Sequence, residues 1–464
     1  MKDKELHQQQ RRQMMLNDPI SRVIPKMAIP TIVAFLINSI YSLADTYFVS
    51  SLGDSATAAV SVNASLDQLI MMCGSMLAIG ANSYIARLLG QGKDEKASQV
   101  LSTAFFLAFS LGALLTVFGM IFMRPMVRLL GATPTCEQYS VDYATYVLLA
   151  APFMASSFVM NQCLRSEGSA TLSMIGMGFG GVLNCVLDPI FIIGMDMGVA
   201  GASLATAISK LVSFAILIFP YITRHSLLRL SICCVRFAKD ILVEIITVGS
   251  SSMFRSGLAV VSGILLNNLA GDISDAVLAG IGVSTKIMMF PFSIILGFGS
   301  GFQPVVGFNW GAKRYDRVRQ SYRFSAWVAI IGAAIMSAIL AVFADEIIML
   351  FSSVEEEQSA QMREIGALCI RLQCLALPIH AWVAVVNMFC TGLGNAWGAF
   401  LLATARQGTC FIPLLFPMTA LWREYGIASV QAAADVLTLI LAIPILIFVN
   451  KKIKKAIGAH GHSV

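Results

Sequence analysis

Carboxylate and amide side chains within the apolar stretches of the sequence are the residues best suited to bind a cation. Asp45 lies near the end of one apolar run, and Asn184 and Asp188 lie near the end of another. Asn184 and Asp188 share a helix face because they are four residues apart. Carboxylate and amide oxygens bind hard cations, and close carboxylates share protons. We expect a cation-coupling site at Asp45, Asn184 and Asp188, with accessory contributions from Asn38, Tyr41 and Asp67.

Two structural interpretations of these acids remain open. Asp45 and Asp188 can instead cap or pair within a structural network. Asp67 can pair with Lys210, which lies in a later apolar run, rather than join the cation site. An ionisable group inside a membrane is costly in either case, so each of these residues requires a partner, a proton or an ion.

The second half of the chain carries a different set of ionisable residues in its apolar runs. Bases predominate there, and Asp435 is the acid placed deepest. We expect Asp435 to neutralise Arg371 or Lys286, which lie at comparable depths. His380 can carry protons, although a lone histidine on a packed helix is more often a hydrogen-bonded core residue. The predicted second network consists of Arg255, Lys286, Arg371, His380 and Asp435, and Arg406 also lies within a span.

The elements that position these residues are predicted to be membrane-spanning helices. The chain is 57% hydrophobic and only 12% charged, which is too apolar for an ordinary soluble protein. Its charges are clustered, and they leave about twelve apolar runs long enough to cross a bilayer as helices. These runs are 24–51, 58–86, 98–123, 141–164, 170–195, 198–221, 241–269, 277–306, 321–344, 364–390, 397–421 and 426–450.

The chain also repeats itself. Residues 90–99 resemble 311–320, about 221 residues later. Asn161, Gly168 and Ala170 recur as Asn387, Gly394 and Ala396, and the segment 197–201 recurs as 425–429. Duplicated apolar halves are typical of transporters with two similar lobes around a shared site. The predicted fold is therefore an all-α integral membrane protein, with about twelve transmembrane helices in two pseudo-symmetric six-helix lobes around a central cleft.

Basic residues fall on alternate connections between the predicted spans, which places both termini in the cytoplasm. The net charge of +6 reports this orientation rather than nucleic-acid binding. We expect a cytoplasmic tail at 1–22, solvated and mobile, and a second tail at 451–464. The N-terminal lobe is predicted at 23–222 and the C-terminal lobe at 241–450, joined by a cytoplasmic linker at 223–240.

Pro30 interrupts the first predicted span. Proline removes a backbone hydrogen bond and favours a kink. Asp45 lies four turns further along the same helix, so a bend at Pro30 that responds to Asp45 protonation is our hypothesis for a hinge.

Several segments resemble motifs of the multidrug and toxic compound extrusion (MATE) family. They are 42–53, 165–170, 184–189 and 301–312. This resemblance covers nearly the whole chain and implies twelve helices in two lobes, with cation-coupled export. Members of the archaeal and DinF-like type use a first-helix Asp with an Asn and an Asp of the fifth helix, which match Asp45, Asn184 and Asp188. Other members use acids of the seventh and tenth helices, where this chain has Arg255, Arg371 and His380, so coupling is expected in the first lobe.

The resemblance and the residues together predict an H⁺- or Na⁺-coupled antiporter that exports drugs or other organic, mainly cationic, compounds by alternating access. We expect a monomer in the cytoplasmic membrane of a prokaryote, with small organic substrates, the lipid bilayer and no nucleic acid as partners. No cofactor is expected, and no metal other than Na⁺ at Asp45, Asn184 and Asp188. A flippase for a lipid-linked saccharide or cell-wall precursor is the alternative. An enzyme is disfavoured because the five histidines are scattered.

Overall fold

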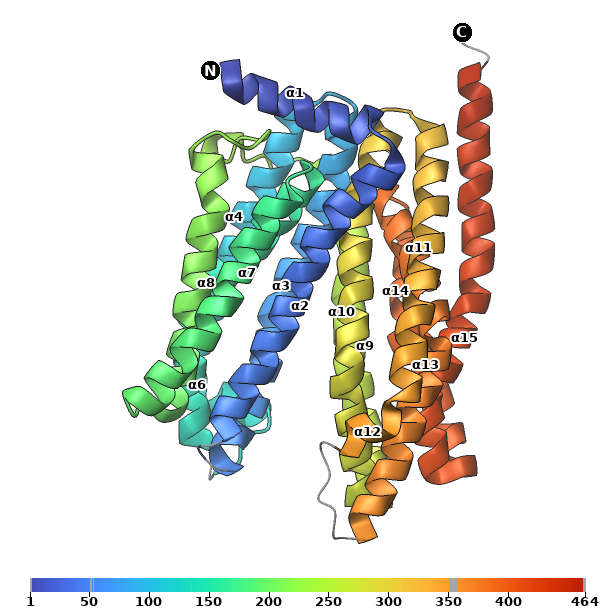
Figure 1. Ribbon diagram of the computed structural model, residues 1–464. Coiled ribbons are helices and arrows are strands. Elements are labelled where there is room, and N and C mark those ends of the chain that lie inside the picture. The colour runs from blue at the N-terminus through green and yellow to red at the C-terminus, as the bar shows by residue number, and fades with distance from the viewer. Residues whose placement is uncertain (1, 51, 53, 135, 350–356, 462–464) are drawn as a thin grey trace.

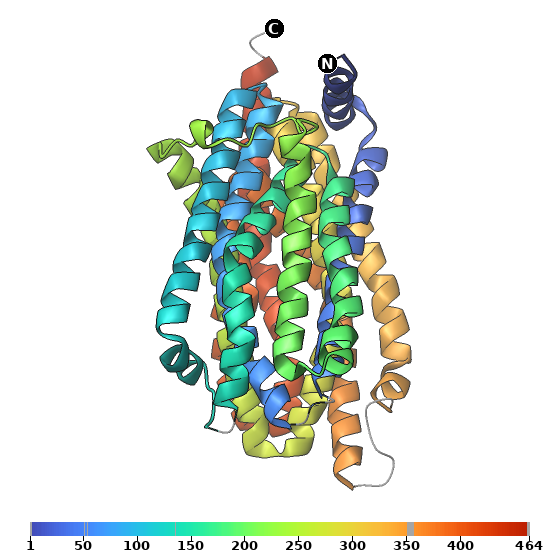
Figure 2. The same ribbon diagram turned by 90° about the vertical axis from the view of Figure 1, so that its left-hand side faces the viewer.

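The computed structural model describes residues 2–50, 52, 54–134, 136–349 and 357–461. Within these residues the chain is helical and forms one upright bundle (Figures 1 and 2). Isolated helices suit a membrane because each satisfies its own backbone hydrogen bonds. The first half contributes α2 (Ile20–Ser50), α3 (Asp54–Gly90), α4 (Asp94–Ile121), α6 (Glu137–Ser166), α7 (Ala170–Pro189) and α8 (Gly198–Ile222).

The second half contributes six main helices. They are α9 (Lys239–Ile273), α10 (Asp275–Gly311), α11 (Tyr315–Val342), α13 (Glu357–Gly392), α14 (Ala396–Thr404) and α15 (Phe411–Gly461), with a π-helical turn η3 (Ala405–Thr409) between the last two. Shorter elements are α1 (Lys2–Asn17), α5 (Met123–Leu129), α12 (Ala344–Met349), the π-helical turn η1 (Ile190–Gly194) and the 3₁₀ turn η2 (Ile232–Cys234).

Eleven helical stretches of the described chain are long and apolar enough to cross a membrane. The last of them, Ala396–Gly458, has 63 residues, which is enough for two spans. The helical geometry breaks at Arg423, where φ is +47°. The break divides this stretch into two spans, which confirms the predicted architecture of twelve helices in two lobes.

The duplicated sequence motifs adopt the same local structure in both halves. Asn161 donates from Nδ2 to the carbonyl of Ser173 at 3.0 Å, and Asn387 donates to the carbonyl of Ala399 at 3.0 Å. The turns that follow contain Gly168 at φ +79° and Gly394 at φ +72°, a left-handed conformation that glycine adopts without a steric penalty. The repeat in the sequence is therefore also a repeat in the structure.

The two lobes meet where α3 crosses α10. A Cβ atom on Gly90 would collide with the carbonyl oxygen of Phe308, and one on Gly311 would collide with the carbonyl oxygen of Arg87. These contacts are reciprocal, because Gly90 is equivalent to Gly311 and Arg87 to Phe308 at the same sequence offset. A reciprocal contact of this kind is what a two-fold relation between the lobes produces.

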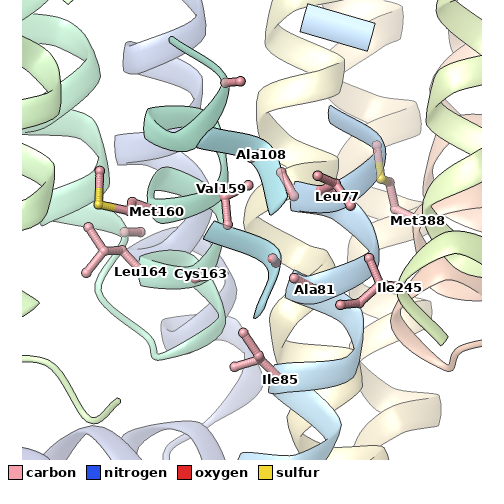
Figure 3. Packing of buried hydrophobic residues seen from close by; sticks show 14 of the residues in the cluster. Leu77, Ala81, Ile85, Ala108, Val159, Met160, Cys163, Leu164, Ile245 and Met388 are labelled. Atoms are coloured by element: carbon pink, nitrogen blue, oxygen red, sulfur yellow. The ribbon is translucent and has the colours of Figure 1, made fainter. Parts of the chain in front are cut away.

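Helix α3 lies at the centre of the apolar core. Leu77, Ala81 and Ile85 of α3 belong to one buried cluster with Val159 of α6 and Ile245 of α9 (Figure 3). This cluster continues from the first lobe into the second, so the core joins the lobes as well as stabilising each one.

Both termini lie at the same end of the bundle (Figure 1). We call this the basic end, because the basic residues Arg11, Arg12, Lys93, Arg229, Lys313 and Lys451 lie on its terminal segments and connections. The lobes run close together at this end and diverge toward the other end (Figure 1).

The N-terminal segment differs from the mobile tail that we expected. Residues 2–17 form helix α1, which lies across the basic end (Figure 1). Met14 and Met15 are buried, and Asn309 of α10 donates to the carbonyl of Met15 at 3.2 Å. Arg12 pairs with Asp94 of α4 in the first lobe. Helix α1 thus contacts both lobes, and buried methionines hold in place a segment whose composition is otherwise polar. The expected C-terminal tail is also helical, since α15 continues to Gly461.

Candidate functional site

Glycines on α7 allow α2 to approach the predicted cation site. A Cβ atom on Gly178 would lie 3.1 Å from Ile37, and one on Gly181 would lie 2.9 Å from the same side chain. Gly181 shares its helix face with Asn184 and Asp188, at spacings of three and seven residues. The glycines therefore bring α2, which carries Tyr41 and Asp45, against the face of α7 that carries the predicted site residues.

The amide of Asn184 lies between a carboxylate and a hydroxyl group. Its oxygen accepts from Thr206 Oγ1 of α8 at 3.2 Å, and its nitrogen donates to Asp188 Oδ2 at 3.2 Å. Asn184 is 2% exposed and Asp188 is fully buried. The amide orientation is assigned from this hydrogen-bond network. The arrangement fixes Asp188 and leaves its carboxylate able to take a proton or a cation.

Three acids of the first lobe interact electrostatically. The charge of Asp45 acts on both Asp188 and Asp67. One buried oxygen of Asp45 and one of Asp67 have no hydrogen-bond partner among the described residues. Buried carboxylate oxygens without donors are unfavourable unless a proton or an ion reaches them.

Lys210 of α8 is a basic residue that interacts with this group of acids. It donates from Nζ to Tyr41 Oη at 3.1 Å, and its ammonium lies 4.8 Å from the centre of the Tyr41 ring. It also interacts electrostatically with Asp67, although the described residues include no direct ion pair between the two. Three carboxylates against one ammonium leave the group with an excess of negative charge when all are ionised. We call Asp45, Asp67, Asp188 and Lys210 the first-lobe cluster.

A small cavity adjoins the first-lobe cluster. It measures about 10 Å³ and is lined by Tyr41, Asn184, Thr206 and Lys210, among others. A space of this size holds about one water molecule or a small ion. It is therefore suited to a coupling ion rather than to an organic substrate.

Two residues of this region were missed in the sequence analysis. Tyr143 of α6 is 3% exposed and interacts electrostatically with Asp45, Asp67 and Asp188. Thr206 binds Asn184 as described. Thr206 lies four residues before Lys210, so helical spacing from that lysine could have identified it. Nothing in the local sequence distinguishes Tyr143 from other span tyrosines.

The remaining first-lobe candidates lie on α2. Asn38 and Tyr41 are half-buried and precede Asp45 on that helix. Pro30 lies inside α2, which continues as a helix on both sides of it. The bend at Pro30 stays a prediction.

The second lobe contains a pocket with the opposite charge. Arg406 of the π-helical turn η3 donates from Nε to Asp435 Oδ1 at 2.7 Å, and His380 Nδ1 lies 3.9 Å from the same oxygen. Beside them is a cavity of about 280 Å³, lined in part by Arg255, His380 and Arg406. π-Helical turns frequently mark functional sites because they shift the register of one side chain. We call Arg255, His380, Arg406 and Asp435 the second-lobe cluster.

The expected partners of Asp435 were wrong. Arg371 donates from Nη2 to Asp345 Oδ2 at 2.6 Å, and both side chains are about half exposed. Lys286 is exposed on α10. Asp435 instead pairs with Arg406, because η3 and the break in α15 bring these two segments together. The predicted network thus keeps Arg255, His380 and Asp435, gains Arg406, and loses Arg371 and Lys286.

Two six-helix lobes with a charged cluster in each define a polytopic membrane transporter. The family model MatE matches residues 30–190 and 252–416. The chain belongs to the MATE family. The sequence resemblance is thereby confirmed, and the protein belongs to a family of transporters rather than of enzymes.

Similar proteins include curated bacterial exporters. The chain is 28% identical to the multidrug export protein MepA of Staphylococcus saprophyticus over 427 residues, which cover 92% of this chain and 93% of that protein. It is 26% identical to MepA of Staphylococcus aureus over 456 residues, which cover 98% of each protein. These relatives are exporters, so the flippase alternative is not favoured.

Solved structures share the fold. A MATE structure in complex with MaL6 has a TM-score of 0.90 at 23% identity, covering 96% of this chain and 99% of that chain. The outward-facing conformation of a multidrug resistance MATE transporter has a TM-score of 0.89 at 23% identity, covering 96% and 98%. The match extends over nearly the whole molecule, so both lobes belong to the same fold.

Proposed function

We propose that this protein is an antiporter that exports organic cations and is driven by H⁺ or Na⁺ bound at the first-lobe cluster. The main supporting observation is the group of acids, Asp45, Asp67 and Asp188, with Lys210 as the nearby counter-charge. One buried oxygen of Asp45 and one of Asp67 lack a donor among the described residues. The similar proteins are multidrug export proteins, which supports the substrate class.

In this proposal, the cationic substrate and the coupling ion compete for the negative charge of the first-lobe cluster. A cationic substrate is favoured while the cluster is anionic, and a bound proton or Na⁺ removes that attraction. The effect is reciprocal, because substrate and coupling ion each weaken the binding of the other. An inward ion gradient then releases substrate to the outside.

Alternating access is the movement that we propose to carry the substrate across. The lobes touch at the basic end through Gly90 and Gly311, and Arg87 of α3 pairs with Glu244 of α9 at 3.0 Å. With the basic end in the cytoplasm, these contacts close the inner side. Separation of the same contacts, together with a bend of α2 at Pro30, would open it.

The test is ion-driven efflux from proteoliposomes. Asp45→Asn and Asp188→Asn remove the charge and keep the shape, and we expect each to slow gradient-driven efflux of a cationic dye roughly tenfold or more, the size of a typical coupling energy. Imposed H⁺ and Na⁺ gradients are applied separately. Asp272→Asn, in an exposed acid of α9, is the matched control. Undiminished efflux by both variants at equal reconstitution would contradict coupling at this cluster.

A further inference from the structure

The pocket in the second lobe has walls of two kinds. Its ionisable lining comes from Arg255 of α9, His380 of α13 and Arg406 of η3. Most of the remaining lining is apolar and includes Phe292, Leu296, Val383, Met388 and Leu402. We propose that this pocket is a binding site for a small organic carboxylate whose body is apolar, a ligand class opposite in charge to the exported cations.

The guanidinium of Arg406 is only partly satisfied by the protein. Its Nε is bound to Asp435, and its central carbon lies 4.5 Å from the centre of the Phe292 ring. Its Nη2 is buried and has no hydrogen-bond partner among the described residues. A buried charged donor without an acceptor costs free energy, and an anion in the pocket would relieve that cost.

Arg255 adds a second positive charge without an acid to balance it. It donates a long hydrogen bond from Nη2 to Ser252 Oγ at 3.4 Å. The ion pairs of the described residues include none with Arg255. Two guanidinium groups against the single carboxylate of Asp435 leave at least one positive charge in excess. Arg255 is half-buried, and charges withdrawn from water are normally paired, so an anion bound in the pocket would balance this excess.

The donors favour a carboxylate. Guanidinium groups bind carboxylates through two parallel hydrogen bonds because the two groups are planar and match in spacing. His380 Nδ1 is also buried without a hydrogen-bond partner, and its ring packs edge-on against Phe292 at 5.2 Å. It can supply a third donor. The cavity of about 280 Å³ lies near the lower limit of ligand pockets, which restricts the ligand to a short-chain or single-ring carboxylate.

Benzoate is a suitable probe because it combines one carboxylate with one ring. We would measure binding of radiolabelled benzoate to the full chain in phosphatidylcholine nanodiscs, with empty nanodiscs as the background. Benzyl alcohol and benzylamine, which have the same ring and a neutral or positive group, serve as competitors. Saturable benzoate binding that neither competitor displaces is the expected result.

Variants locate the site. Arg255→Gln should weaken benzoate binding roughly tenfold or more, the usual size of one charge-assisted hydrogen bond. It breaks no ion pair, so it should fold. Arg406→Gln with Asp435→Asn removes the other arginine and its partner together and should weaken binding similarly. Arg371→Gln is the matched control, because this arginine pairs with Asp345 and does not line the pocket.

Three outcomes would overturn the proposal. They are absence of saturable benzoate binding to the wild-type protein, unchanged binding by Arg255→Gln, and displacement by benzyl alcohol as strong as by unlabelled benzoate. The site does not depend on cation coupling, so benzoate binding should persist in Asp45→Asn. Failure of dye efflux and failure of benzoate binding are therefore separate results.

Discussion

Lys210 places a positive charge beside the first-lobe acids. It binds the hydroxyl group of Tyr41 and interacts with Asp67, so it offsets part of the negative charge of the cluster. A transporter needs its ion to leave as well as to bind. Under the proposed coupling, Lys210 would weaken ion binding at these acids and thereby favour release of the ion.

Removal of this charge should strengthen ion binding. In Lys210→Gln we expect half-maximal efflux at a several-fold lower H⁺ or Na⁺ concentration, because a neutral side chain no longer repels the ion. The measurement is the ion dependence of dye efflux in proteoliposomes. Lys286→Gln, an exposed lysine of the second lobe, should leave that dependence unchanged. A shift to higher ion concentrations in Lys210→Gln would contradict this account.

The duplicated asparagines allow a prediction about stability. Asn387→Ala leaves the buried carbonyl of Ala399 without its donor, which costs about 1–3 kcal/mol. Asn161→Ala should cost more, because Asn161 also accepts from Arg165, a side chain that is 1% exposed. Thermal unfolding of the purified variants measures both effects. Equal losses would mean that the bond to Arg165 adds nothing.

At the scale of elements, glycines determine how closely the helices approach. The contacts of Gly90 with Phe308 and of Gly311 with Arg87 hold α3 against α10 at the basic end. Gly178 and Gly181 do the same for α7 and α2 beside the first-lobe cluster. In the absence of a large hydrophobic driving force between helices in lipid, close packing at small residues is a main source of association.

A methyl group at the lobe contact should separate the lobes. Gly90→Ala forces its Cβ into the carbonyl oxygen of Phe308, and overpacking of this kind costs about 1–3 kcal/mol. We expect faster hydrogen exchange in the peptides around residues 84–93 and 308–315. Gly332→Ala, at a glycine with open space around it, is the control. Exchange at the basic end that matches the control would show that this contact does not hold the lobes together.

At the scale of the whole molecule, helix α1 links the lobes across the basic end. Arg12 pairs with Asp94 of the first lobe, and Arg317 of the second lobe donates to the carbonyl of Asp18 at 2.8 Å. The linker is also held, since buried Glu167 accepts from Ser226 Oγ at 2.6 Å. The basic end is therefore a layer of connections that any relative movement of the lobes must rearrange.

Loss of the Arg317 contact should release α1. In Arg317→Gln we expect proteolytic cleavage within residues 2–17 to become several-fold faster, because cleavage follows the population of the opened segment. Arg319→Gln, an exposed arginine of the same helix, should not change the rate. Equal rates in the two variants would mean that the Arg317 bond does not hold α1 in place, and that its other contacts, such as Arg12 with Asp94, are sufficient.

Much of the fold was predictable because a bilayer restricts the possible structures. Apolar runs of sufficient length must be helices, and their number and duplication led to two lobes. The positions of Asp45, Asn184 and Asp188 near the ends of their apolar runs were also sufficient to predict that these residues lie together. These predictions rest on spacing along single helices, which the sequence contains directly.

By itself, the sequence determined the spans, the repeat and the identity of the first-lobe acids. Only the tertiary structure decided that Asp435 pairs with Arg406 rather than Arg371, that Tyr143 lies among the first-lobe acids, and that residues 2–17 pack as a helix. Each of these depends on which helix faces meet, and that choice is made by glycine contacts, a π-helical turn and a break at Arg423. Small changes in register at such points rotate a whole helix face, so pairing across helices cannot be obtained from periodicity alone.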